Sequence, residues 1–320
     1  MKLSVVVPCY NEADGLVELR RRVVAACEAV VGDDFEIVLI DDGSRDETRA
    51  MITRFHDEDR RFVGCLLARN HGHQLALTAG LSVARGERVM VLDADLQDPP
   101  ELLGPMMELM DQGFDVVYGQ RRERTGETYF KKKSASLFYR LLNLMVDTAI
   151  PEDTGDFRLM SSRVVEVLQG MPERQRYIRG MVAWIGFRQT AIEYDRDPRF
   201  AGETKYPLAK MLRLALDAVT AFSTVPLRLA TWMGFALAFV SCLLILYTLA
   251  VWVAGRTVDG WTSLMMIVLL IGGMQMIMIG VLGEYLGRLY MESKRRPIFI
   301  IETVLRAETK APEVARRAAD

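Results

Sequence analysis

Short apolar runs alternate with longer amphipathic stretches through the first 120 residues. The apolar runs are rich in β-formers and comprise LSVVVP (3–8), FEIVLI (35–40), FVGCLLA (62–68), ERVMVL (87–92) and DVVYG (115–119). Helical spacing of apolar residues fills the intervals 15–31, 47–59, 74–85 and 101–112. Strands that alternate with helices through short links form mostly parallel sheets with helices on both faces. Residues 1–204 are therefore predicted to form an α/β domain of Rossmann-like character.

The pattern changes completely in the last third of the chain. Residues 229–255 and 260–283 carry no charged side chain, and each stretch exceeds the roughly 20 residues that a helix needs to cross a bilayer. Neither stretch has a polar face, which disfavours two buried helices of a soluble bundle. We therefore predict two transmembrane helices within residues 227–290.

Basic residues flank this pair of helices unequally. Lys294, Arg295 and Arg296 follow the second stretch and Arg228 precedes the first, whereas the link between them carries only Arg256. Because cytoplasmic ends are enriched in Lys and Arg, we expect a multi-pass protein of the plasma membrane with the first domain and both termini in the cytoplasm. The start MKLSVVVPCYNE is predicted as a strand and not as a signal peptide.

Two segments border the predicted membrane helices. Residues 205–226 place apolar side chains at helical spacing, which fits a core helix or, next to a membrane span, an interface helix. Because this segment directly precedes the first predicted transmembrane helix, we favour the interface helix. Residues 291–320 are assigned to a cytoplasmic tail, which we expect to be frayed after Thr303.

Composition excludes some classes of function. The net charge is only −2, so there is no electrostatic case for binding nucleic acid. The four cysteines are scattered without a C-x-x-C pair, which disfavours a zinc site or a disulfide framework and fits a reducing compartment.

Acidic residues follow three of the predicted strands. The strand ends carry PCYNE (8–12), DDGSRDET (41–48) and DADLQDPP (93–100). Ligands of such sheets bind beyond the carboxyl ends of the strands, so these loops should rim one acidic pocket. Asp46 and Asp98 are expected to cap the helices that follow them. Asp93, Asp95 and Gln97 precede the helix and offer oxygen ligands suited to Mg²⁺ or Mn²⁺.

The same region lacks the usual glycine-rich phosphate loops, so a bound diphosphate would need a metal ion to screen its charge. His71 and His73 form an H-x-H pair on a predicted turn. Without a third ligand nearby such a pair is more often incidental, and we expect contact behind the site and not metal ligation.

Five features in order carry a family resemblance: PCYNE, IDDGSRDET, LDADLQDPPE, TGDFRL and the two apolar helices near the C-terminus. They resemble family 2 glycosyltransferases of the GT-A fold, and within these the polyprenyl-phosphate glycosyltransferases. The similarity runs from Leu3 to about Ile301. It implies an inverting, metal-dependent transfer of a sugar from a nucleotide sugar to polyprenyl phosphate, with glucose from UDP-glucose as the first candidate.

The resemblance also implies roles for individual residues. The nucleotide sugar would be bound by Pro8, Tyr10, Glu12, Asp42, Asp93, Arg199 and Lys205. Asp93, Asp95 and Gln97 would hold the metal, and Asp156 in TGDFRL occupies the position of the candidate catalytic base. Because the attacking phosphate is already anionic near neutral pH, Asp156 could equally be a positioning group.

A basic run at 121–136 is the candidate acceptor site. It is either a solvated loop, a contact with anionic lipid headgroups, or a binding segment for polyprenyl phosphate. We favour the last interpretation and assign the phosphate to Arg121, Arg122, Lys132 and Ser136.

Two other functions compete with lipid-linked sugar transfer. A processive polysaccharide synthase would carry a tryptophan after the motif R-x-x-R, where this chain has Gly180, and would need more than two crossings. A membrane-anchored protein that binds nucleotide sugar without turnover would not need the intact acids. Small residues at Gly272, Gly273, Gly280 and Gly283 could also pack the hairpin against copies of itself.

Overall fold

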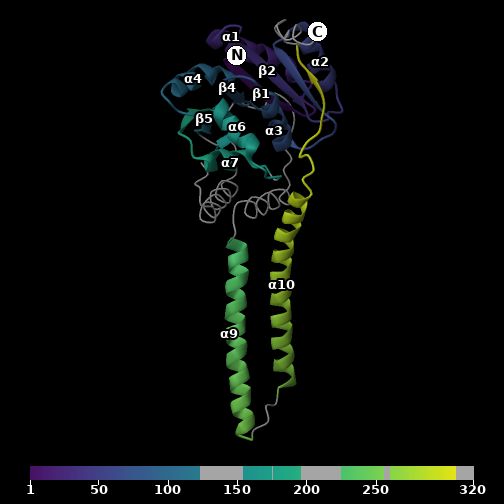
Figure 1. Cartoon of the computed structure of the whole chain (residues 1–320), viewed down its shortest axis with the longest axis vertical. Helices are drawn as coiled ribbons and strands as arrows, with labels where there is room; N and C mark the ends of the chain where they lie inside the picture. The colour runs from purple at the N-terminus through teal and green to yellow at the C-terminus, as the bar shows by residue number, and fades with distance from the viewer. Residues whose placement is uncertain (123–153, 175, 196–224, 256–259, 308–320) are drawn as a thin grey trace, which may run out of the picture. The chain divides into compact units, whose positions relative to one another are not determined.

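The computed structural model describes residues 1–122, 154–174, 176–195, 225–255 and 260–307 (Figure 1). Two compact units can be distinguished along the chain. One contains the sheet and includes the segment from Pro297 onward, and the other contains the two long apolar helices. Each unit is described separately below.

All five predicted strands are present. They are β1 (Leu3–Cys9), β2 (Phe35–Asp41), β3 (Phe62–Leu67), β4 (Arg88–Val91) and β5 (Val116–Arg121). The four predicted helices follow in the expected intervals as α1 (Leu16–Val31), α2 (Thr48–Glu58), α3 (His73–Val83) and α4 (Leu103–Asp111), the last preceded by the short 3-10 helix η1 (Pro100–Leu102). Strand β1 pairs in parallel with β2 and β4, and β2 with β3.

Three further strands complete a mixed sheet of eight. These are β6 (Thr154–Ser161), β7 (Gln189–Tyr194) and β8 (Ile301–Leu305), and the strand order is β7-β5-β6-β4-β1-β2-β3-β8. Strand β6 is antiparallel to both β4 and β5. Helices α6 (Ser162–Gly170) and α7 (Ile178–Ile185) lie between β6 and β7 in the chain.

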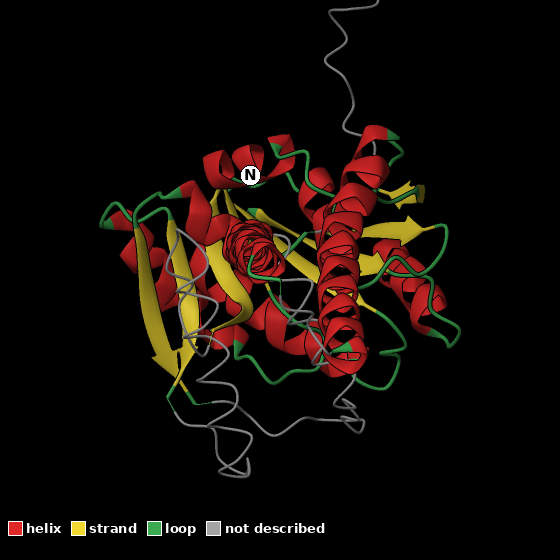
Figure 2. Ribbon diagram, turned by 90° about the horizontal axis from the view of Figure 1, so that it is seen from below, coloured by secondary structure: helices red, strands yellow, loops and turns green. Residues whose placement is uncertain are grey.

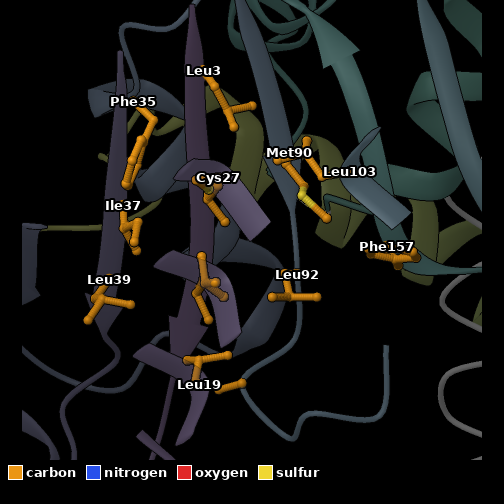
Figure 3. Packing of buried hydrophobic residues seen from close by; sticks show 14 of the residues in the cluster. Leu3, Leu19, Cys27, Phe35, Ile37, Leu39, Met90, Leu92, Leu103 and Phe157 are labelled. Carbon is orange, nitrogen blue, oxygen red and sulfur yellow. The ribbon is translucent and has the colours of Figure 1, made fainter. Parts of the chain in front are cut away.

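Helices cover both faces of the sheet (Figure 2), which explains why every residue of β1 and β2 is buried. On one face, side chains of β1 and β2 such as Leu3 and Ile37 share a core with Cys27 of α1 and Leu103 of α4 (Figure 3). On the other face α3 approaches so closely that a Cβ on Gly80 would lie 2.4 Å from the Ile40 side chain. The sheet is therefore packed between two layers of helices. The edge formed by the carboxyl ends of its parallel strands is where ligands of such sheets bind.

The expectation of a frayed tail after Thr303 is wrong as far as Leu305. Strand β8 extends the sheet by pairing antiparallel with β3, with Thr303 opposite Leu66. Directly after β8, Arg306 Nη1 lies 3.0 Å from Oε2 of Glu36. Glu36 is buried and also accepts hydrogen bonds from the Ser4 hydroxyl (2.6 Å) and the Arg85 backbone N–H (2.7 Å). The buried Glu36 carboxylate is thus paired with Arg306, a cation from the C-terminal part of the chain.

We expect Arg306→Ala to lower the free energy of unfolding by about 1–3 kcal/mol, because it leaves the buried Glu36 carboxylate without its counter-ion. Arg49→Ala is the matched control. Arg49 also ties β8 to the sheet unit, through Glu302 at 2.8 Å, but this pair is exposed and should contribute less than about 1 kcal/mol. Chemical denaturation of the detergent-purified protein measures both, and equal losses would contradict the anchoring role of Arg306.

The second unit consists of α9 (Val225–Val253) and α10 (Trp261–Ser293). Within them, Leu229–Val251 and Met266–Ser293 are long and apolar enough to cross a membrane, with mean hydropathies of 2.3 and 2.2. Neither stretch is buried by other described parts of the chain, unlike a core helix of a soluble protein. The predicted interface segment 205–226 lies outside the described residues except for its last two positions, which begin α9.

Candidate active site

The loops that follow β4, β1 and β2 lie side by side, because these strands are neighbours in the sheet and run in the same direction. This confirms the prediction that the three acidic strand ends share one edge. The start of β6 joins these loops as a fourth segment, although β6 runs in the opposite direction to β4. Strand β6 is antiparallel to β4, with Arg158 opposite Val91, so the start of β6 lies where β4 ends. Asp156 thereby comes to lie beside the loop that carries Asp93.

Asp156 is buried and is surrounded by donors. Its Oδ2 accepts hydrogen bonds from Gln74 Nε2 at 2.9 Å and lies 3.0 Å from His73 Nε2, and its Oδ1 accepts from Arg179 Nε at 2.9 Å. The side chain of Arg158, which is equally buried, lies 4.0 Å from Oδ1. Gln74 also accepts from the backbone N–H of Ile178 at 2.9 Å, so the same contacts hold the start of α7 against the start of α3.

These contacts determine the charge of Asp156. Burial by itself disfavours the carboxylate, but the Arg179 charge, the hydrogen bonds from His73 and Arg179 and the Arg158 charge outweigh it, and the pKa of Asp156 lies well below its ordinary value. Burial in turn lowers the pKa of Arg158 to about 10, against the opposing effect of Asp156. Asp156 is consequently favoured as the carboxylate, with its oxygens already engaged by donors, which disfavours a role as proton acceptor.

The loop that follows β4 presents its oxygens in an alternating pattern. Asp93, Asp95 and Gln97 are partly exposed, whereas Ala94, Leu96 and Asp98, which alternate with them, are buried. Leu96 has a positive φ of 59°, which a branched side chain rarely adopts outside turns held by their surroundings. The backbone N–H of Gln97 donates to Asp95 Oδ1 at 3.2 Å. The turn thus directs the three predicted metal ligands to the open side of the loop.

The environment of Asp93 in this loop disfavours its charged form. Burial raises its pKa to about 6; the neighbouring His73 opposes this shift, and the charges of Asp156, Asp98 and Asp95 reinforce it. Its Oδ1 is shielded from solvent and has no hydrogen-bond donor among the described residues. An acid held among acids, with an oxygen that lacks a donor, is the electrostatic environment that a bound cation would relieve.

His73 contacts this cluster, in agreement with the expected contact behind the site. Potential ligand atoms of His73, Asp93 and Asp156 all lie within 4.8 Å of one another, and His73 Nε2 is 3.5 Å from Asp93 Oδ1. The two carboxylates suit a small divalent ion such as Mg²⁺ or Mn²⁺, whereas imidazole is a less usual ligand of these ions and His73 Nε2 is already engaged with Asp156. His73 therefore contacts the acids that could hold the ion, as a neighbour of the candidate metal ligands.

Asp98 has a different environment from the one predicted. It was expected to cap a helix, but the N-cap residue of η1 is Pro99, and the fully buried Asp98 accepts a hydrogen bond at Oδ1 from the hydroxyl of Tyr194 on β7. Asp46 is closer to its expected role, because its carboxylate accepts from the backbone N–H of Thr48 at 3.1 Å, the first residue of α2.

The residues expected to bind the nucleotide sugar lie at the ends of β1 and β2. Pro8 is buried in β1, Glu12 is partly buried and the Tyr10 ring is 44% exposed at the rim. Asp42 holds a turn: its Oδ1 accepts from the backbone N–H of His71 at 2.7 Å and its Oδ2 from that of Gly72 at 2.9 Å.

Gly43 makes this approach of two loops feasible. Its φ is +69°, and a Cβ on it would lie 2.6 Å from the backbone nitrogen of Asn70. Asp42 and Gly43 therefore hold the turn that follows β3 against the loop that follows β2.

Two of the predicted acceptor residues are described. Arg121 ends β5, and its Nε lies 3.4 Å from the Tyr194 hydroxyl. Arg122 pairs on the surface with Glu193 at 3.3 Å. Lys132, Ser136, Arg199 and Lys205 lie outside the described residues, so the roles assigned to them stay predictions.

Sequence reasoning missed Gln74, Arg158 and Arg179 around Asp156, and Tyr194 beside Asp98, and it did not identify Asp156 as the partner of His73. Arg158 could have been inferred from TGDFRL, because it alternates with Asp156 on a strand. Arg179 lies in the R-x-x-R motif, which the sequence analysis used only to argue against a processive synthase, because no tryptophan follows it. The partners of His73 and Gln74 carry no local signal, since they come from more than 80 positions away.

Comparison with known proteins gives this geometry a family. Residues 4–168 match the model of glycosyl transferase family 2, and residues 225–289 match that of the GtrB C-terminal hairpin. The chain belongs to glycosyl transferase family 2, and it has the predicted GT-A fold.

Several relatives are similar over nearly their whole length. The uncharacterized glycosyltransferase YkcC of Bacillus subtilis (strain 168) is 43% identical over 97% of this chain and 96% of its own. The prophage bactoprenol glucosyl transferase homolog of Escherichia coli (strain K12) is 41% identical over 95% and 99%. The bactoprenol glucosyl transferase of Shigella phage SfV is 40% identical over 94% and 98%. The predicted resemblance to polyprenyl-phosphate glycosyltransferases is thereby confirmed.

Proposed function

We propose that this protein transfers glucose from UDP-glucose to a polyprenyl phosphate and forms a polyprenyl-monophosphate glucose. The observation that most supports this function is the cluster of Asp93, His73 and Asp156 at the carboxyl edge of the sheet. The same chain also has two apolar helices that are long enough to cross a membrane. Relatives named as bactoprenol glucosyl transferases share about 40% of its residues along both parts, which supports the acceptor class and the sugar.

The acid cluster accounts for binding of the donor diphosphate. Asp93, Asp95 and Gln97, with His73 beside them, would hold Mg²⁺ or Mn²⁺ at the open side of the β4 loop. When bound by these residues, such an ion would offer positive charge for the leaving nucleoside diphosphate. Asp42, Pro8, Tyr10 and Glu12 would form the nucleoside pocket, and Arg199 and Lys205 would contact the phosphates.

The protein then has to bring the acceptor oxygen to the anomeric carbon. A phosphate monoester has its second pKa near 6, so the nucleophile is already charged at neutral pH. A strong general base is unnecessary, which agrees with the low pKa of Asp156. We assign to Asp156 the role of a fixed anion that orients His73, Gln74 and Arg179 around the reacting groups. Inversion follows from a single in-line displacement.

The remaining assignments concern the membrane. We propose that α9 and α10 cross the plasma membrane, with the link 256–259 outside and the sheet domain and both termini in the cytoplasm. Residues 205–226 would form the interface segment, and Arg121, Arg122, Lys132 and Ser136 would bind the lipid phosphate. Self-association through the hairpin glycines stays a prediction from the sequence.

The test is a transfer assay with the purified full-length protein, undecaprenyl phosphate in detergent micelles and a panel of radiolabelled nucleotide sugars, with Mg²⁺, Mn²⁺ or EDTA. We expect label from UDP-glucose in the organic-extractable lipid, in a metal-dependent manner. Label that accumulates in a water-soluble or insoluble polymer would indicate a processive synthase. Nucleotide binding without transfer from any donor would indicate a binding protein and contradict the proposal.

A further inference from the structure

A second polar network lies next to the acid cluster, and its centre is Tyr194. The side chain of Tyr194 is only 4% exposed. Its hydroxyl donates to Asp98 at the end of the β4 loop and lies 3.4 Å from Nε of Arg121. One hydroxyl therefore connects the loop that carries the candidate metal ligands with the first arginine of the candidate acceptor segment.

The backbone places these groups with little freedom. Arg121 and Tyr194 are register partners at the ends of the parallel strands β5 and β7, and the backbone N–H of Arg122 donates to the Tyr194 carbonyl at 3.1 Å. The Tyr194 ring packs edge-on against Phe157, with centroids 5.5 Å apart. Gly119 leaves the space for this pair, since a Cβ there would lie 2.5 Å from Phe157 and 2.8 Å from Tyr194.

Arg121 is directed toward the reaction site by the same arrangement. Its Nη2 lies 3.1 Å from the point that a Cβ on Gly155 would occupy, and Gly155 directly precedes Asp156. The side chain is partly buried, so its position depends on the few polar groups around it. The charge of Asp98 and the Tyr194 hydroxyl both favour the guanidinium there.

We infer that Tyr194 is a positioning residue for the acceptor: its hydroxyl, held by Asp98, fixes Arg121 where the arginine meets the phosphate of the lipid. The inference rests on the proposed function, because Arg121 is an acceptor ligand only if the lipid phosphate binds at this edge. The inference adds a requirement beyond the assignment of Arg121 to the acceptor. Arg121 is held in position for the phosphate only while Asp98, at the end of the loop after β4, keeps the Tyr194 hydroxyl in place.

Tyr194→Phe tests this directly, since it keeps the ring against Phe157 and removes only the hydroxyl. We expect the KM for undecaprenyl phosphate to rise about tenfold, as for the loss of one hydrogen bond to a charged group. The KM for the nucleotide sugar should change less than about twofold. Tyr118→Phe is the matched control, because Tyr118 loses the same hydroxyl from the same strand pair but points away from Arg121.

A double-mutant cycle separates positioning from a general structural effect. If Tyr194 acts through Arg121, Tyr194→Phe should raise the acceptor KM in the wild type but cause no further rise in an Arg121→Ala background. Additive effects, an unchanged acceptor KM, or a rise confined to the nucleotide-sugar KM would each overturn the inference.

Two measurements keep these outcomes distinguishable from misfolding and from failure of the proposed function. Tyr194→Phe combined with Asp98→Asn removes the buried charge together with its donor, so it should fold if the single variant does not, and its acceptor KM should still be raised. Absence of transfer by the wild-type protein would overturn the proposed function, whereas an active wild type with an unaffected Tyr194→Phe overturns only the role of Tyr194.

Discussion

Asp95→Asn is expected to reduce kcat/KM for sugar transfer by a factor on the order of 10²–10³ at saturating Mg²⁺, which is the scale for losing one group that stabilises developing charge. Asparagine keeps an oxygen that can accept from the Gln97 backbone N–H, so the turn should persist while the ligand charge is lost. The thermal midpoint should therefore remain close to that of the wild type. Initial rates with UDP-glucose and undecaprenyl phosphate, titrated with Mg²⁺, measure the effect.

The matched control is Asp59→Asn, which removes the same charge before β3, at the opposite edge of the sheet. Asp59 holds Arg61 at 2.9 Å and is far from the cluster, so its loss should change turnover less than about twofold. An Asp95→Asn variant that retains near-wild-type turnover at saturating metal would refute the assignment of Asp95 as a metal ligand.

Asp156→Asn should have the second large effect, on stability as well as on transfer. It leaves buried Arg158 and half-buried Arg179 without their shared anion, and removal of one partner from a buried ion pair costs about 3–5 kcal/mol of the free energy of unfolding. Transfer should also fall, because His73, Gln74 and Arg179 lose the acceptor that orients them. Denaturation curves and rates measured on the folded fraction report the two effects separately.

Asp115→Asn is the corresponding control. Asp115 is also buried, but its Arg163 partner is 62% exposed and can be solvated after the substitution, so the loss of stability should be smaller and the transfer rate retained. Equal destabilisation by both substitutions would contradict the special cost of the Asp156 cluster.

The pH dependence follows from the sign of the Asp156 shift. Its pKa in the folded protein lies below the unfolded value, so the carboxylate contributes stability that is fully present above about pH 4 and is lost as the pH falls through the folded-state pKa. In EDTA, the stability contributed by the Asp156 carboxylate should therefore be lost only as the pH falls below about 4. His73 and Asp93 lie beside Asp156 and their pKa values are raised, so NMR titration of the Asp156 carboxyl carbon is the measurement that separates its ionisation from theirs. A carboxyl carbon of Asp156 that titrates between pH 6 and 8 would contradict the fixed anion and favour a general base.

Much of the local structure was predictable because it depends on neighbours in the chain. Apolar runs that stop at PCYNE, IDDGS and DADLQD mark strands whose carboxyl ends face one edge, and the alternation with helices makes those strands parallel and adjacent. The meeting of the three acidic loops at one edge follows from this regularity. The apolar stretches 229–255 and 260–283 are equally local signals, because membrane insertion is governed by the composition of about 20 consecutive residues.

Other features depend on contacts between distant segments. Strand β8 is short and half polar, and only its pairing with β3 and the buried Glu36 makes it a strand. His73 was one half of an H-x-H pair whose partner the sequence did not indicate, and Tyr194 was one of ten tyrosines. Each acquires a role from partners more than 80 positions away, Asp156 for His73 and Asp98 for Tyr194.

The sequence by itself determined the class of protein and the edge of the sheet at which its acidic loops meet, because strand direction is encoded locally. Only the tertiary structure decided what Asp156 can do. The antiparallel strand β6 carries it next to Asp93 and into contact with His73, Gln74 and Arg179, and those donors keep it ionised. Its pKa belongs to this assembled environment, which no stretch of the chain contains by itself.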